Sequence, residues 1–124
     1  VTAEVMAFLR ERIAACERAG MTRERLLVDP GFGIAKTVSP NLQLMQEIAE
    51  LQALALPVLI GVSRKSLFGK VLGRDVSERL SGSLAAAVMC VERGAMIVRA
   101  HDVKETVDVV RFAHAVRESQ KELS

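Results

Sequence analysis

Three short segments of the chain carry side chains that together could bind an anionic, heterocyclic ligand. Asp29 opens a glycine-containing loop, where the backbone can approach a ligand closely and the carboxylate can accept two N–H bonds from a heterocycle. Residues 63–66, Ser-Arg-Lys-Ser, place two cations beside two hydroxyls, which suits an anionic or carbonyl-bearing ligand. Arg99 and His101 are two residues apart, so in an extended segment they point to the same side. The helix expected from Val103 adds free N–H groups, and the combination is typical of a phosphate or pyrophosphate site.

Each segment also has a simpler interpretation. Asp-Pro-Gly is a common turn, a basic loop is often only solvated, and a histidine before a helix can cap local backbone. The loop over 29–37 is not a P-loop, because no glycine directly precedes Lys36, and it lacks the third glycine of a dinucleotide fingerprint. For Arg99 and His101, the anion site is the favoured interpretation.

Hydrophobic periodicity predicts four helices separated by three short apolar strands. We expect helices over 2–19, from Ser39 along an apolar stripe of Leu44, Ile48, Leu51 and Ala55, over 77–93 and over 103–121. We expect strands over 26–28, 58–62 and 96–98. The order α-βα-βα-βα, with strands recurring at intervals that a helix can span, predicts an α/β fold with three parallel strands. All three strands end at one of the polar segments, and α/β folds bind ligands at the carboxyl ends of their strands.

Capping residues mark the expected helix ends. Thr2 and Ser39 are the expected N-caps, with Pro40 at the first helical position. Gly20 and Gly94 are expected to stop their helices. Asp102 and Glu105 form a potential capping box for the last helix.

The helix expected over 77–93 is apolar on both sides. One face carries Leu80, Leu84, Ala87 and Val91, and the opposite face carries Gly82, Ala86 and Met89. A helix that is apolar on both sides is buried on both sides. We expect one face to cover the strands and the other to pack against a second subunit or another helix.

Composition excludes several classes of protein. The chain has 124 residues, of which half are hydrophobic and about a quarter charged, as in a single globular domain. A net charge of +2 does not favour nucleic acid, and four Phe without Trp or Tyr do not favour a surface that stacks bases. No apolar run reaches the roughly 20 residues of a membrane span, and the first residues do not resemble a signal peptide, so we expect a cytoplasmic protein. The chain begins at Val1, and we expect it to be a piece of a longer protein.

The remaining titratable candidates are interpreted as structural. Cys16 and Cys90 do not make a disulfide framework, and both are expected to be buried apolar residues. They lie far from any Cys/His pair that would suggest zinc. His114 is expected on the surface of the last helix.

Four segments resemble the dihydropteroate synthase family. They are Leu-Leu-Val-Asp-Pro-Gly-Phe-Gly at 26–33 with Lys36, Gly-Val-Ser-Arg-Lys-Ser at 61–66, Glu-Arg-Leu-Ser-Gly-Ser-Leu-Ala at 78–85, and Arg-Ala-His-Asp-Val-Lys-Glu-Thr at 99–106. Other pterin-binding barrels share the fold but not the pair Ser-Arg-Lys-Ser and Arg-x-His-Asp. The resemblance implies that residues 1–124 are the C-terminal portion of a single (β/α)8 TIM barrel whose N-terminal strands are missing.

The resemblance also implies a reaction and a role for each matching residue. The family joins 6-hydroxymethyl-7,8-dihydropterin pyrophosphate to 4-aminobenzoate in folate biosynthesis and is inhibited by sulfonamides. The implied pterin ligands are Asp29, Gly33 and Lys65. The implied aminobenzoate ligands are Ser63, Arg64 and Ser66. Arg99 and His101 would hold the leaving pyrophosphate, and the implied catalytic residues are Lys65, Arg99 and His101.

Further expectations concern cofactor and assembly. The family uses Mg²⁺, whose ligands are expected in the missing part, and forms homodimers through its last three helices. Three strands do not close a barrel, so we expect this chain to be inactive alone. The alternative is a non-catalytic half-barrel that oligomerises or binds phosphate. Ile34-Ala35 replace the Phe-Gly usual in the family, and we expect this to raise the sulfonamide Ki relative to an Ile34→Phe enzyme.

Overall fold

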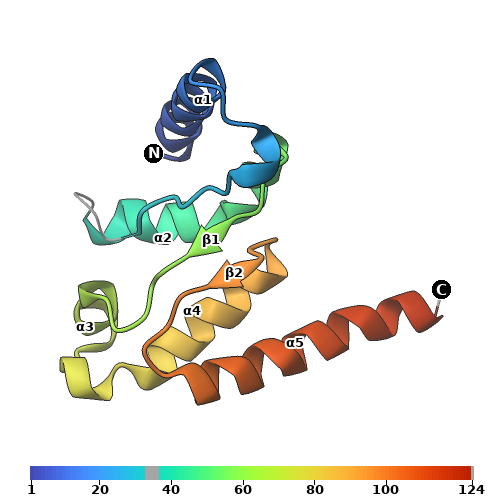
Figure 1. Cartoon of the computed structure of the whole chain (residues 1–124). Coiled ribbons are helices and arrows are strands. Elements are labelled where there is room, and N and C mark those ends of the chain that lie inside the picture. The colour runs from blue at the N-terminus through green and yellow to red at the C-terminus, as the bar shows by residue number, and fades with distance from the viewer. Residues whose placement is uncertain (33–36, 124) are drawn as a thin grey trace.

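The computed structural model describes residues 1–32 and 37–123, and most of them are helical (Figure 1). The α-helices are α1 (Thr2–Arg18), α2 (Val38–Gln46), α3 (Ser66–Leu72), α4 (Leu80–Glu92) and α5 (Val103–Leu123). Short 3-10 helices lie at Arg23–Arg25, Ile48–Leu54 and Val76–Glu78. The strands are β1 (Leu59–Ile60) and β2 (Ile97–Val98).

The two strands form a parallel sheet, in the direction expected, but the third strand is not formed as such. Leu59 pairs with Ile97, and a single parallel bridge joins Val28 to Val58. Around this bridge the Val28 N–H donates to the Pro57 carbonyl at 2.9 Å. The ladder stops there because Pro30, two residues on, has no N–H to donate. The expected three-stranded sheet is therefore a two-stranded sheet with one added bridge.

The core lies between the strands and α2. Leu44, Ile48 and Leu51 are fully buried, as the apolar stripe predicted. The helix does not run unbroken to Ala55, however, because α2 ends at Gln46 and a 3-10 helix follows. In a 3-10 helix side chains three apart share a face, so Leu54 joins the core. Ala55 is exposed at φ 57°, which corrects its expected place on the stripe.

Both glycine stops are confirmed and share one mechanism. Gly20 has φ +96°, its N–H donates to Glu17 O, and the next N–H donates to Cys16 O. Gly94 has φ +109°, its N–H donates to Val91 O, and the next N–H donates to Cys90 O. This pair of bonds is the Schellman motif, which needs the left-handed conformation that glycine adopts without strain.

The expected N-caps are wrong. Helix α1 already includes Thr2, whose buried hydroxyl donates to Glu47 Oε1 at 3.0 Å and so ties α1 to the end of α2. Helix α2 begins at Val38, so Ser39 lies inside it and Pro40 is its third residue. Proline is tolerated there because the first-turn N–H groups have no partner within the helix.

Helix α4 is largely buried on both sides by neighbours within the chain, although Leu80 at its start is exposed. It begins at Leu80, since Val76–Glu78 form a separate 3-10 helix. Helix α5 covers one side of α4, and α2 and α3 cover the other. A methyl group on Gly82 would lie 2.7 Å from Phe68 Cδ1, so the absence of a side chain lets α3 approach. The small-residue face is therefore occupied by another helix, and Met89 alone of its three expected residues is exposed.

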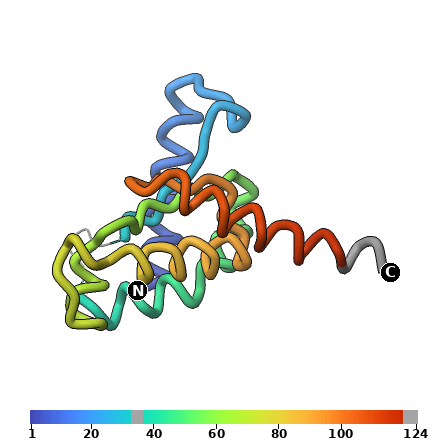
Figure 2. The backbone as a smooth tube through the Cα atoms, turned by 90° about the horizontal axis from the view of Figure 1, so that it is seen from below, coloured from blue at the N-terminus to red at the C-terminus, as the bar shows by residue number. Residues whose placement is uncertain are grey.

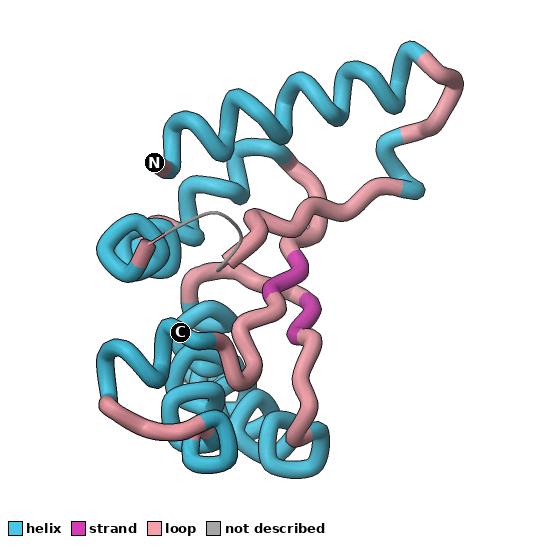
Figure 3. Tube along the Cα trace, turned by 90° about the vertical axis from the view of Figure 1, so that its left-hand side faces the viewer, coloured by secondary structure: helices cyan, strands magenta, loops and turns pink. Residues whose placement is uncertain are grey.

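The strands lie in the middle of the molecule, with α1 on one side and α4 and α5 on the other (Figures 1 and 3). The end of α5 projects beyond the other elements (Figure 2). Among the described residues, none of the helices combines the length and apolar character needed to cross a membrane. The strands thus carry the loops at their carboxyl ends, residues 61–65 and 99–102, side by side.

Candidate functional site

The two loops that follow β1 and β2 continue the pairing of the strands. The Arg99 N–H donates to the Ile60 carbonyl at 2.9 Å, immediately beyond the strand pair. The Arg99 guanidinium then lies over Gly61, where a methyl group would come within 2.5 Å of Nη2. Only a residue without a side chain leaves this space, so Gly61 determines where the Arg99 charge lies.

The Ser63 hydroxyl contacts both the backbone and the ring of His101. Ser63 Oγ accepts the His101 N–H at 3.0 Å and lies 2.9 Å from Nδ1 of the ring. Nδ1 is therefore occupied by an internal contact, and Nε2 is the ring nitrogen left for a ligand. His101 is thus held by Ser63 of the neighbouring loop.

Arg64 occupies a left-handed backbone conformation, φ 55°, which residues other than glycine rarely adopt. Its N–H donates to Ser83 Oγ at 2.9 Å, and its carbonyl accepts Arg79 Nη1 at 3.2 Å. Its guanidinium makes two bonds to Asp102, at 2.8 Å to Oδ1 and 3.3 Å to Oδ2. The hydrogen bond from Arg64, and the charges of Arg64 and His101, hold the pKa of Asp102 below its ordinary value.

These loops enclose a cavity of about 680 Å³. Its lining residues are Gly61, Ser63, Arg64, Lys65, Val76, Arg99, Ala100 and His101. Five sequence-predicted site residues are among them, namely Ser63, Arg64, Lys65, Arg99 and His101. Because Asp102 pairs with Arg64, the positive charge of the cavity comes chiefly from Lys65 and Arg99. Ser66 is the first residue of α3, a helix that the sequence pattern did not predict.

Asp29 lies in a different concavity from this cationic cavity. It lines a hollow of about 640 Å³ together with residues of α1 and the start of α2. Its Oδ1 accepts the Gly31 N–H at 2.8 Å, the turn geometry that Asp-Pro-Gly favours. Gly33 and Ile34 lie outside the described residues.

Four residues that support the cavity were not identified as such from sequence. Gly61, Arg79 and Ser83 lie inside the segments that resemble the family, but no local spacing connects them to Arg99 or Arg64. Asp102 was expected in a capping box with Glu105, and its carboxylate pairs with Arg64 instead. At the start of α5 the Asp102 carbonyl accepts the Thr106 N–H at 3.0 Å and the Thr106 hydroxyl at 2.7 Å.

Of the residues interpreted as structural, Cys90 and His114 have the expected surroundings, whereas Cys16 is less buried than expected. Cys90 is fully buried, and burial raises the pKa of its thiol to about 11 although Arg93 opposes the shift. Cys16 is partly buried. His114 is exposed on α5, with Nε2 3.9 Å from Glu118. Within residues 1–32 and 37–123, no three His, Cys, Asp or Glu side chains gather as a metal site.

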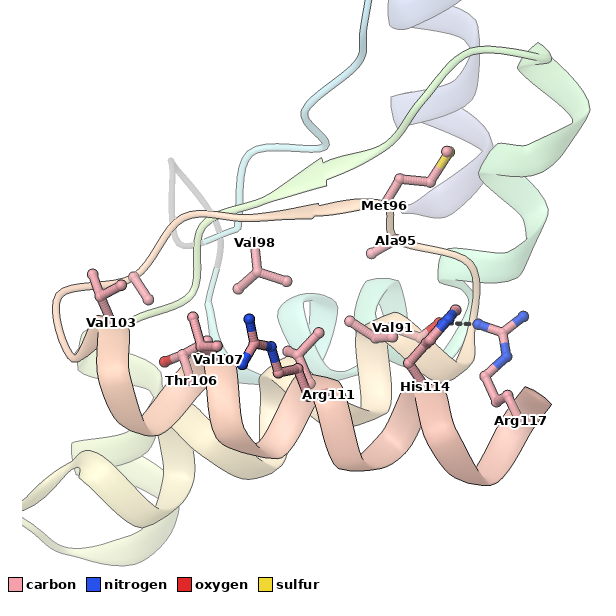
Figure 4. Close-up of a pocket in the computed structure, with 12 residues that line it drawn as sticks. Val91, Ala95, Met96, Val98, Val103, Thr106, Val107, Arg111, His114 and Arg117 are labelled. Atoms are coloured by element: carbon pink, nitrogen blue, oxygen red, sulfur yellow. Dashed lines mark hydrogen bonds between the residues drawn. The ribbon is translucent and has the colours of Figure 1, made fainter. Parts of the chain in front are cut away.

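A second groove, largely apolar, lies between β2 and α5 (Figure 4). Met96 and Val98 border it on the strand side, and Val103 and Val107 on the helix side. Arg117 donates to the Val91 carbonyl at 2.8 Å at one end, which holds α5 on α4. Met96 is 72 % exposed, so this edge of the sheet is uncovered in the described structure.

Residues 1–101 match the family model described as "Pterin binding enzyme". Among curated proteins, the chain is 51% identical over 115 residues to the dihydropteroate synthase of Escherichia coli strain K12. This match covers 93% of the chain and 41% of the relative. The chain thus spans about two fifths of the length of the curated relatives it matches.

Solved structures agree with this similarity. The dihydropteroate synthase of Yersinia pestis with a sulfonamide drug superposes with a TM-score of 0.92 at 40% identity, covering 94% of this chain and 43% of that one. The enzyme of Xanthomonas albilineans in complex with 7,8-dihydropteroate gives a TM-score of 0.90 at 46% identity, covering 93% and 46%. Similarity of this level extends to nearly the whole backbone described above.

Proposed function

Since this chain belongs to the family of pterin-binding enzymes, we propose that it forms the C-terminal portion of a dihydropteroate synthase. The reaction joins 6-hydroxymethyl-7,8-dihydropterin pyrophosphate to 4-aminobenzoate and releases pyrophosphate. The relatives that carry this name match nearly all of the chain. The observation that carries the proposal is the cavity in which Lys65, Arg99 and His101 converge from two adjacent strand ends.

The cavity suits the leaving group. Pyrophosphate is a multiply charged anion, and Arg99 offers a planar set of donors that matches phosphate oxygens. His101 Nε2 adds a donor when it carries the proton, because Nδ1 is occupied by Ser63. Lys65 supplies a second positive charge to the cavity. Positioned cations of this kind stabilise charge that develops in a transition state.

The chemical steps follow from that stabilisation. The bond between the pterin methylene carbon and the bridging oxygen breaks, and the pyrophosphate keeps the electron pair. The resulting pterin cation is attacked by the amine of 4-aminobenzoate, which forms the C–N bond and loses a proton. Arg99 and His101 act in the first step, and Lys65 lies where it can contact both the pterin and the aminobenzoate.

The remaining ligand assignments follow the family resemblance. Asp29 binds the pterin ring nitrogens, with Gly33 beside it, and Ser63 and Ser66 serve the aminobenzoate. Asp29 directly follows Val28, which forms the bridge to Val58. The segment of Val28 therefore lies next to β1, and the loop after β1 lines the cationic cavity. A ligand that joins a pterin to a pyrophosphate spans such neighbouring strand ends. Sulfonamides would compete for the aminobenzoate part of the site.

The parallel strands belong to a (β/α)8 barrel in this proposal. The groove between β2 and α5 (Figure 4) exposes apolar side chains that a neighbouring strand and helix of a closed barrel would cover. Because the chain covers 41% of its E. coli relative, the remaining strands would come from the part outside this chain. Pairing at β2 would also satisfy the open strand edge.

Mg²⁺ would be held by residues outside this chain. The described residues offer no group of three potential ligands, so no step at this site is assigned to the metal. When bound, Mg²⁺ supplies charge neutralisation for the pyrophosphate.

A cytoplasmic homodimer is the proposed form of the whole enzyme, joined through its last helices. On α5, Phe112 and Val116 are four residues apart and are 74% and 53% exposed. Two large apolar side chains on one helical face are typical of a surface that packs against another protein. Sedimentation equilibrium of Phe112→Ser should show a lower mass than the parent chain, and an unchanged dimer would contradict this interface.

The anion site is tested directly by calorimetric titration of the chain with pyrophosphate. Arg99→Ala should raise the Kd by about tenfold or more, since one charge-assisted bond contributes about 1.5–3 kcal/mol. Arg10→Ala, which removes an exposed arginine of α1, is the matched control and should bind as the parent does. Equal Kd values for Arg99→Ala and the parent would overturn the assignment of Arg99.

Turnover requires a complete barrel. A chimera would join this chain to the part of the E. coli relative that it does not match. We expect it to form dihydropteroate, with inhibition by a sulfonamide and loss of turnover in His101→Ala. A folded chimera that binds pyrophosphate but forms no product would favour the non-catalytic, phosphate-binding alternative.

A further inference from the structure

We propose that Arg64 is a positioning residue, which through Asp102 holds the loop of Ser63 and Lys65 in place against the loop of Arg99 and His101. The inference rests on the proposed function, because it concerns the same anion site. It differs from the ligand role that the family resemblance suggests for Arg64. The carrying observation is a two-point contact between the ends of two parallel strands.

The Arg64 backbone is held in an unfavourable conformation by three neighbours. With φ 55°, a residue with a side chain is strained unless its surroundings determine its position. Ser83 of α4 accepts the Arg64 N–H, and Arg79 donates to the Arg64 carbonyl. Asp102 binds the side chain. Strain that is maintained from three directions beside a ligand cavity indicates that the position of this residue matters for the cavity.

The contact with Asp102 joins the loop that contains Arg64 to the loop that contains His101. Arg64 is flanked directly by Ser63 and Lys65, and Asp102 directly follows His101. The guanidinium makes two bonds to one carboxylate, which fixes orientation as well as distance. A lysine would keep the charge but lose this paired geometry. Movement of Arg64 would therefore shift Lys65 and loosen the Ser63–His101 contact.

Arg64 is a poor candidate for a direct anion ligand. Two of its guanidinium nitrogens donate to Asp102, whose negative charge offsets its own. The pair is also open to solvent, since the Arg64 and Asp102 side chains are 43% and 23% exposed. Exposed ion pairs contribute little to folding. The effect of breaking this pair should therefore be larger on ligand binding than on the unfolding temperature.

The test compares Arg64→Ala, Arg64→Lys, Asp102→Asn and the double variant Arg64→Ala/Asp102→Asn. Pyrophosphate Kd is measured on the chain, and KM for each substrate is measured on the chimera. Each single variant should raise the pyrophosphate Kd about tenfold, because small misplacements of binding groups are costly. The double variant should be no worse than either single one, and KM for 4-aminobenzoate should rise as well, because Ser63 and Lys65 flank Arg64. Glu78→Gln, which breaks the exposed pair of Arg74 and Glu78, is the control and should leave Kd unchanged.

Several outcomes would overturn the positioning role. If Arg64→Ala weakens binding but Asp102→Asn does not, Arg64 contacts the ligand itself. Effects that add in the double variant would show that Arg64 and Asp102 act independently. Full activity of Arg64→Lys would show that the charge alone matters. Asp102→Asn keeps the size of the side chain, so it tests whether the Arg64–Asp102 contact is needed for binding even if Arg64→Ala does not fold. If the parent chain binds no pyrophosphate, the proposed function is contradicted. If the parent binds pyrophosphate and the variants bind it equally well, only the positioning role is contradicted.

Discussion

Ser63 Oγ lies 2.9 Å from His101 Nδ1, and the two residues are 38 positions apart in the chain. The strand partners Leu59 and Ile97 have the same offset, and so do Arg64 and Asp102. The register of the parallel sheet is therefore continued by side-chain bonds beyond the last backbone pair. The geometry of the candidate site is an extension of strand pairing, and changes that disturb this register should disturb ligand binding.

Gly61→Ala should weaken pyrophosphate binding about as much as Arg99→Ala does. The new methyl group would lie 2.5 Å from Arg99 Nη2, so the guanidinium must leave its place. The loss of one charge-assisted bond corresponds to a Kd roughly tenfold higher. Calorimetric titration with pyrophosphate measures the change.

The control is the same Gly61→Ala substitution made in a chain that already carries Arg99→Ala. If the methyl group acts by displacing Arg99, it should have no additional effect once that side chain is absent. A further loss of affinity in the double variant would mean that Gly61 serves the ligand or the backbone in another way.

The pairing of Asp102 with Arg64 should make the free energy of unfolding depend on pH in the acid range. Arg64 lowers the pKa of Asp102 in the folded chain below its ordinary value of 3.8, whereas the unfolded chain has that ordinary value. The resulting stabilisation is fully present above the ordinary value and is lost as pH falls through the lowered one. The difference in free energy of unfolding between the parent and Asp102→Asn should thus be constant from neutral pH to about 5 and shrink below about 4. Urea titrations at several pH values measure it, and a difference that grows on acidification would contradict the pairing.

Gly82→Ala should destabilise the chain despite the better helix propensity of alanine. The added methyl group would lie 2.7 Å from Phe68 Cδ1, in the contact between α4 and α3. Overpacking costs about 1–3 kcal/mol and helix propensity returns at most about 1 kcal/mol, so we expect a net loss of about 1 kcal/mol. Urea unfolding measures the loss. In a Phe68→Leu background the same substitution should be neutral or stabilising, and an equal loss there would show that Phe68 is not the cause.

Cys90 should be chemically inert in the folded chain. It is fully buried, and burial raises the pKa of its thiol to about 11, which leaves roughly a thousandth as thiolate at pH 8. A Cys16→Ser chain should therefore incorporate no iodoacetamide at pH 8 until urea unfolds it. Labelling of that chain under native conditions, seen by mass spectrometry, would contradict the buried position.

Local patterns were reliable where the interaction itself is local. Gly20 and Gly94 end their helices as expected, because the left-handed turn and its two bonds involve neighbouring residues only. The expected N-caps at Thr2 and Ser39 were wrong, because both residues lie inside their helices. Thr2 binds Glu47 across the fold, and α2 starts one residue earlier than Ser39.

The sequence by itself determined the alternation of helices with parallel strands, the buried stripe of Leu44, Ile48 and Leu51, and the polar segments that follow β1 and β2, but not α3. These depend on periodicity and on the rule that parallel strands direct their carboxyl ends to one edge. It also carried the resemblance to the pterin-binding enzymes, because the matching motifs are contiguous.

Only the tertiary structure decided how the site residues are supported. It showed that Gly61 makes room for Arg99, that Asp102 turns from helix capping to Arg64, and that Asp29 lies in a separate concavity. The physical reason is that partners 38 residues apart are brought together by the register of the strands. That register depends on packing of the whole sheet and its helices, and no short stretch of sequence contains it.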